Sequence, residues 1–165
     1  MADATDGRWP HVYDRDVLHA LRTALAATAS LLIARLIRLP EAYWAAITTI
    51  IVMQSSLGAA WAISKQRLVG TAIGAFLAAA VAIYAGTQWG FYCAAILAAG
   101  VICVLLGIGR NAFRYAGITV TIVMLVPRTH SYWMIALHRF IEISLGIAVG
   151  LALTALWPEP DPADV

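Results

Sequence analysis

The stretch ITTIIVMQSSLGAAWAISKQRLVGTAIG, residues 47–74, decides the fold because its pattern occurs twice in the chain. The opening ITTIIVM, at 47–53, returns as ITVTIVM at 118–124. After one extra residue the correspondence continues, pairing Trp61 with Trp133, Ile63 with Ile135, Arg67 with Arg139, and Gly74 with Gly146. A repeat on this scale indicates duplicated architecture, so we expect two similar halves that meet at a shared interface.

The composition indicates an integral membrane protein. Hydrophobic residues make up 62% of the 165 residues and charged residues 12%, and the mean hydropathy is +0.81. A soluble domain carries about 25% charged residues, so most of this surface cannot face water. The net charge of +2 gives no sign of a basic surface for nucleic acid.

Six stretches are candidate membrane-spanning helices, each of which needs about 20 mainly apolar residues. They cover residues 17–37, 42–57, 66–85, 91–108, 112–126 and 132–157, of which the second and fifth are short. Residues 1–16 have no apolar core, so we expect a polar tail rather than a signal peptide. Residues 159–165 are expected to be a disordered acidic tail. The sequence thus predicts an all-α polytopic membrane protein with six transmembrane helices in residues 17–158.

The two halves, about 17–86 and about 89–158, each hold three of these spans. Three is an odd number, so the second half must cross the membrane in the opposite direction, as in the inverted repeats of transporters. Lys and Arg residues are more frequent near the span ends on the side of the termini. Positive residues favour the cytoplasm, so we expect both termini there.

The two short spans occupy corresponding places in the halves, and such a pair is the best sequence pointer to a central site. Thr48 and Thr49 in one, with Thr119 and Thr121 in the other, could supply hydroxyl groups to it. The alternative is that each threonine hydroxyl bonds back to its own helix.

The strongest local signal is Arg139 with Glu142 three residues later and His138 beside them. Positions i and i+3 share a helix face, so the two charged groups can pair. Charges inside a span face the bundle interior, a partner or water, which makes Glu142 and His138 candidates for carrying a proton. The alternative is a structural ion pair that fixes helix register, with His19 and His138 as interfacial or packing residues.

In the first half, Arg67 has Gly70 where the repeat places the glutamate. A guanidinium without an intrahelical carboxylate suits an organic anion, which it can bind bidentately. Arg22 and Arg114 could add to this positive field, and Trp44 could stack on an aromatic ring. The alternative for Arg22 and Arg114 is that they reach toward lipid headgroups.

The sequence gives no support for a catalytic, phosphate-binding or metal-binding site. There is no catalytic triad with supporting context, no glycine-rich phosphate loop and no Cys/His metal spacing, so neither an enzyme nor a cofactor is expected. The glycines lie inside apolar spans at four-residue steps, which is typical of close helix packing. The glycines assigned to this packing are Gly70, Gly74, Gly146 and Gly150.

Several motifs together resemble the fusaric acid resistance family, which includes the aromatic acid exporters. They are LPEAYWA at 39–45, Gln54 and Gly58, RLVGTAIG at 67–74, and the Arg139-x-x-Glu142-x-x-x-Gly146 pattern. The plant aluminium-activated malate channels are similar at a greater distance. The resemblance implies a six-span unit of the bacterial inner membrane, associated with efflux of aromatic carboxylic acids. Ser55 departs from the proline frequent in the family, and many relatives are several times longer, so we expect this unit to form a homo-oligomer.

These observations predict an exporter of small organic, aromatic anions that uses the proton gradient. The residues assigned to substrate or anion binding are Arg67, Arg139, Arg22, Arg114, Trp44, Gln54, Thr48 and Thr119. Glu142 and His138 are assigned to proton coupling. An uncoupled anion channel and a non-transporting scaffold or accessory subunit are the alternatives.

Overall fold

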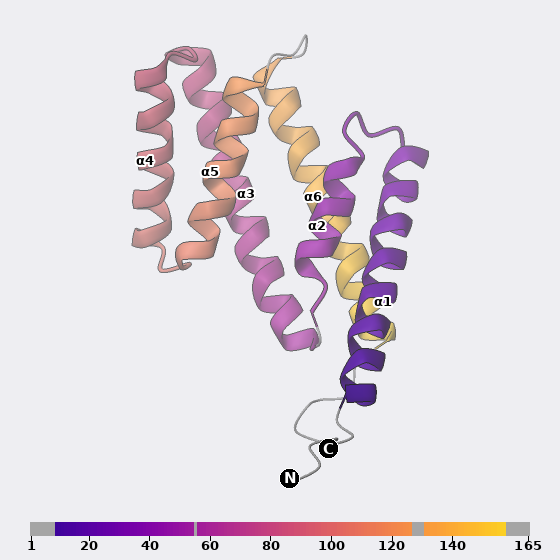
Figure 1. The fold of residues 1–165 in the computed structure, drawn as a ribbon. Helices are drawn as coiled ribbons and strands as arrows, with labels where there is room; N and C mark the ends of the chain where they lie inside the picture. The colour runs from indigo at the N-terminus through magenta and orange to yellow at the C-terminus, as the bar shows by residue number, and fades with distance from the viewer. Residues whose placement is uncertain (1–8, 55, 127–130, 158–165) are drawn as a thin grey trace, which may run out of the picture.

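The computed structural model describes residues 9–54, 56–126 and 131–157, and every regular element in these ranges is an α-helix. The six helices, shown in Figure 1, are α1 (Trp9–Leu36), α2 (Tyr43–Val52), α3 (Leu57–Tyr84), α4 (Trp89–Leu105), α5 (Arg110–Leu125) and α6 (Tyr132–Leu156). The all-α prediction is confirmed. The expected acidic tail at 159–165 and residues 1–8 of the expected polar tail lie outside the described residues.

Two helix starts differ from the expected ones by more than two residues. α3 begins at Leu57 and includes the segment that was expected to connect the second and third spans. Ser56 explains this start, because its hydroxyl oxygen accepts a hydrogen bond from the Ala59 amide at 3.3 Å and caps the helix. α1 begins at Trp9, before the expected start at Val17.

Three segments of the described chain are long and apolar enough to cross a membrane. They are Asp16–Leu36, Leu57–Tyr84 and Tyr132–Leu156. α2 and α4 are also apolar, but with 10 and 17 residues they are shorter than the about 20 that a span needs. By length and composition these segments support the membrane assignment made from the sequence.

The helices form two groups of three, visible side by side in Figure 1. α1, α2 and α6 pack together, as do α3, α4 and α5, and the two groups meet mainly where α3 packs against α6. Each group therefore combines two helices of one sequence half with the third helix of the other half. α1 and α4 lie at opposite outer edges of the bundle (Figure 1).

Glycines allow the closest helix contacts within these groups. A Cβ atom added at Gly70 or Gly74 of α3 would lie within 3 Å of the backbone of Ala112 or Ala116 in α5. A Cβ at Gly146 of α6 would clash in the same way with the carbonyl of Ala45 in α2. The glycines of the two third helices thus bring their backbones against the two short helices.

Gly150 continues this contact along α6. An added Cβ there would lie 3.1 Å from a methyl group of Val52. Nearby, the Thr49 hydroxyl donates to the Ala45 carbonyl of its own helix and lies 3.0 Å from the carbonyl of Gly146. α2 and α6 are therefore held together by both packing and a polar contact.

Candidate functional site

A small cavity lies where the two helix groups meet. Its free space is about 10 Å³, which is room for roughly one water molecule. It receives side chains from four helices, namely Trp44, Arg67, Thr71, Tyr115, Ile118, Thr119, Ile122, Arg139 and Ile143. Four residues assigned to anion binding from the sequence therefore line one cavity: Arg67, Arg139, Trp44 and Thr119.

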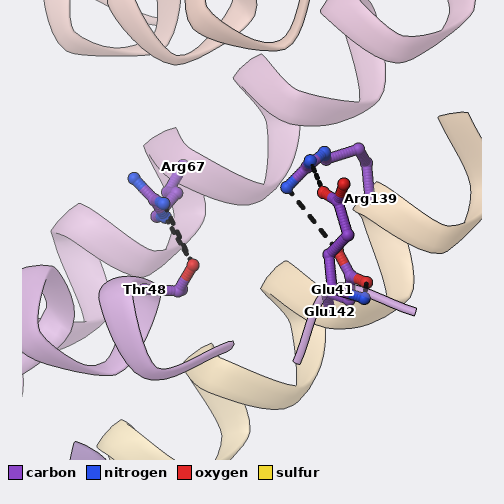
Figure 2. Close-up of polar contacts among 5 residues, drawn as sticks. All are labelled: Glu41, Thr48, Arg67, Arg139 and Glu142. Carbon is purple, nitrogen blue, oxygen red and sulfur yellow. Dashed lines mark hydrogen bonds and ion pairs between the residues drawn. The ribbon is translucent and has the colours of Figure 1, made fainter. Parts of the chain in front are cut away.

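Arg67, from α3, is buried at 4% exposure. Its Nη2 and Nε donate hydrogen bonds to the Thr48 hydroxyl of α2, at 3.0 and 3.3 Å (Figure 2). Its guanidinium carbon lies 4.8 Å from the centre of the Tyr115 ring in α5, a cation–π contact. Within the described part of the chain, no carboxylate forms an ion pair with Arg67.

Arg139, from α6, is 1% exposed and has a different set of partners. Its guanidinium carbon lies 4.3 Å from the centre of the Trp44 ring. Its Nη2 donates to the Glu41 carboxylate, and its Nη1 lies 3.6 Å from a carboxylate oxygen of Glu142 (Figure 2). Arg139 is thus held by one aromatic ring and two carboxylates.

The two arginines make equivalent contacts under the sequence repeat. When 47–53 is aligned with 118–124, Trp44 corresponds to Tyr115, and Arg67 corresponds to Arg139 after the extra residue. Each arginine lies over the aromatic residue of the other half. The glycine contacts follow the same rule, since Gly74 packs on Ala116 and Gly146 packs on Ala45.

The two halves differ at Glu142, which takes the place of Gly70. In the first half Gly70 packs on the backbone of Ala112. In the second half the Glu142 carboxylate accepts a hydrogen bond from the Glu41 backbone amide at 2.9 Å. Glu41 aligns with Ala112. The hydrogen bond between the Glu142 carboxylate and the Glu41 amide therefore takes the place of the direct contact between Gly70 and the Ala112 backbone. The surroundings of Arg139 therefore include two acidic groups, Glu41 and Glu142, that the surroundings of Arg67 lack.

Arg22 does not belong to the cavity. It is fully buried in α1, and it donates hydrogen bonds to the backbone carbonyls of Gln54, at 2.7 Å, and Trp157, at 2.5 Å. These carbonyls follow the ends of α2 and α6, where helix carbonyls lack helical partners. The Gln54 side chain donates to the Met53 carbonyl at 2.8 Å. Arg22 thus ties three helices together at one end of their group.

The remaining predicted residues lie elsewhere. Arg114 is exposed, and His19 and His138 are half-buried, but none of the three lines the cavity. The hydroxyls of Thr119 and Thr121 donate to carbonyls of their own helix, at 2.9 and 2.8 Å. These are the bonds within one helix that were predicted as the alternative to hydroxyl groups facing a central site.

Two residues of the site were not singled out from the sequence. Glu41 belongs to the LPEAYWA segment, between two predicted spans, and Tyr115 follows Arg114 at the start of a short span. The repeat alignment could have found Tyr115, because it corresponds to Trp44. Among the described residues, no group of three His, Cys, Asp or Glu residues is arranged to hold a metal ion.

Comparison with known proteins gives two matches. The family described as fusaric acid resistance protein-like matches residues 27–153. The inner membrane protein YeeA of Escherichia coli strain K12 is 27% identical over 148 residues, which are 87% of this chain and 41% of that protein. The chain therefore spans less than half the length of this relative. No solved structure matches.

Proposed function

The chain belongs to the fusaric acid resistance protein-like family, and on this premise we propose that it is a membrane transporter that exports small aromatic carboxylic acids. The observation that carries the proposal is the pair of buried arginines, Arg67 and Arg139, each beside an aromatic ring on one cavity. Ionisable residues inside a membrane bundle commonly face ion or substrate paths, and Arg67 and Arg139 differ from Arg22 in that they line the cavity.

The chemistry of the cavity suits an aromatic carboxylate. A guanidinium binds a carboxylate through two parallel hydrogen bonds, and it remains charged at any physiological pH. Trp44 and Tyr115 offer ring faces, and Ile118, Ile122 and Ile143 offer apolar contact for the rest of the molecule. Arg67 has hydroxyl and aromatic partners that an incoming carboxylate can supplement.

We further propose that the six helices are six spans arranged as an inverted repeat. The equivalent contacts of Arg67 with Tyr115 and of Arg139 with Trp44 support this arrangement. The cavity then lies between groups that can move relative to each other. Its free space of about 10 Å³ cannot hold an aromatic acid, so transport requires that the groups separate on one side at a time.

Glu142 is proposed to couple transport to protons. With both glutamates ionised, the cluster of Arg67, Arg139, Glu41 and Glu142 is neutral. A bound carboxylate gives it a net negative charge in a low-dielectric site, and protonation of one glutamate removes that charge. Glu142 is the more buried of the two, with 1% side-chain exposure, and is the better candidate.

Location and assembly follow from the same premise. The relative from Escherichia coli is an inner membrane protein, so we propose the inner membrane for this chain as well. α1 begins and α6 ends at the same end of the bundle in Figure 1, which supports termini on one side, the cytoplasm in this proposal. We also propose that the chain works as a homo-oligomer.

The decisive test is transport of benzoate by the purified chain in lipid vesicles. Vesicles loaded with radiolabelled benzoate should release it faster than empty-lipid controls, and an imposed pH gradient should change the rate. Glu142→Gln should keep benzoate binding but lose the response to the gradient. Release that ignores the gradient in the unmodified protein would indicate an uncoupled channel, and no release at all would contradict transport.

A further inference from the structure

We propose that Glu41 is an internal competitor of the substrate: its carboxylate occupies Arg139 until a substrate carboxylate displaces it. Arg67 is then the site where an anion can bind first. Arg139 becomes available to an anion only after the Glu41 carboxylate has left it. This inference rests on the proposed function, and it assigns a role to a residue that lies outside the helices.

The contacts of Glu41 suit a side chain that can leave while its backbone stays. The Glu41 backbone amide is fixed by the Glu142 carboxylate at 2.9 Å, whereas its own carboxylate accepts from Arg139 (Figure 2). The Glu41 side chain is 17% exposed, against 1% for Arg139 and Glu142. Glu41 is therefore the most exposed side chain of this cluster and the one best placed to move away from Arg139.

The repeat supplies an internal comparison. Arg67 and Arg139 correspond, and so do their aromatic partners, but Ala112 stands where Glu41 would be. Arg67 binds a neutral hydroxyl, that of Thr48, instead of a carboxylate. The arginine and the ring are thus common to both halves, while the acidic competitor is present in one alone.

The exchange at Arg139 is electrostatically mild. A substrate carboxylate that replaces the Glu41 carboxylate leaves the Arg139 guanidinium with two carboxylate partners before and after, so its charge is not left buried alone. Glu142 stays in place, since its carboxylate holds the Glu41 amide and faces Arg139 at 3.6 Å. A tethered group competes at an effective concentration of about millimolar or more, so it lowers the apparent affinity for substrate markedly.

The test is a benzoate titration of the full chain in detergent by calorimetry, with benzamide as the uncharged probe. Glu41→Gln keeps the size of the side chain and removes its charge, so it should bind benzoate about tenfold more tightly than the unmodified protein. Benzamide binding should not change. Equal or weaker benzoate binding by Glu41→Gln, with the unmodified protein binding benzoate, would overturn the competitor role alone.

Two further arms keep the result unambiguous. If neither protein binds benzoate, the proposed function fails together with this inference. If Glu41→Gln does not fold, as judged by circular dichroism, Glu41→Asp replaces it. That variant keeps the charge but is one methylene shorter, so its hold on Arg139 is weaker. It should bind benzoate more tightly than the unmodified protein, and an unchanged affinity would overturn the proposal.

Discussion

Arg67 of α3 donates two hydrogen bonds to the Thr48 hydroxyl of α2, at 3.0 and 3.3 Å, across the boundary between the two helix groups. α2 and α3 follow each other in the chain but belong to different groups and share few other contacts. This polar contact therefore links the two bodies that the proposed transport cycle separates.

Thr48→Val should weaken this link. The hydroxyl accepts both bonds from a buried cation, so its loss should lower the free energy of unfolding by about 1–3 kcal/mol. Thr119→Val is the matched control, because Thr119 is the repeat equivalent and its hydroxyl donates only to the Tyr115 carbonyl of its own helix. Thermal unfolding in detergent, followed by circular dichroism, measures both. Equal losses for the two variants would show that the contact with Arg67 contributes nothing specific.

Arg67→Gln should lower benzoate affinity by about 10–100-fold, which is the usual worth of a hydrogen bond to a charged group. Arg67→Lys should recover only part of it, because an ammonium group cannot form the paired bonds of a guanidinium. Lys65→Gln removes an exposed positive charge two residues away and serves as the control. The calorimetric titration described above checks this. A Lys65→Gln effect as large as that of Arg67→Gln would mean that general surface charge, rather than the cavity, attracts the anion.

Tyr115→Leu should weaken the hold on Arg67 and lower stability by about 0.5–2 kcal/mol, since the ring supplies a cation–π contact at 4.8 Å. Tyr115→Phe keeps the ring and should stay close to the unmodified protein. The melting temperature distinguishes the two variants. Equal losses of stability in Tyr115→Phe and Tyr115→Leu would indicate that the Tyr115 hydroxyl, rather than its ring face, stabilises the protein.

Gly74→Ala should destabilise the protein by about 1–3 kcal/mol or more, because the added methyl group meets the Ala116 backbone, which cannot move aside without shifting α5. Gly117→Ala in α5 meets nothing within 4 Å and should be neutral or stabilising by up to about 1 kcal/mol. The difference in melting temperature between these two variants checks the close approach of α3 and α5. Similar values would contradict it.

Arg22→Gln should reduce stability without changing anion selectivity. The lost bonds to the Gln54 and Trp157 carbonyls are charge-assisted, and their removal should cost roughly 2–4 kcal/mol. Arg35→Gln, at an exposed position of the same helix, should have little effect. Unfolding and the ratio of benzoate to acetate transport are measured together. A changed ratio with unchanged stability would return Arg22 to the substrate path.

The sequence could predict the helices and the central arginines because both depend on regular signals. Apolar runs indicate helices in a membrane protein, and the repeat singles out Arg67 and Arg139, which both lie on the cavity. Trp44 was found through its aromatic ring beside a short span. These features are local or periodic, so they are readable without a structure.

The parts that sequence reasoning missed depend on contacts between distant segments. Glu41 lies outside any periodic pattern, and it contacts Arg139 from 98 positions away. Arg22 binds backbone carbonyls, which no side-chain pattern can reveal. The start of α3 depends on one capping hydroxyl at Ser56. Periodicity does not encode such partners.

The exchange of third helices between the two groups also imposes an order on biosynthesis. α2 is translated long before α6, and α3 before α5, although glycines bring the backbones of these pairs into direct contact. During synthesis Arg67 is therefore made before its partner Tyr115, and Glu41 is made before its partner Arg139. These contacts form only when the second half has been made. A chain truncated before α6 would lack Arg139 and Ile143 and therefore could not form the cavity.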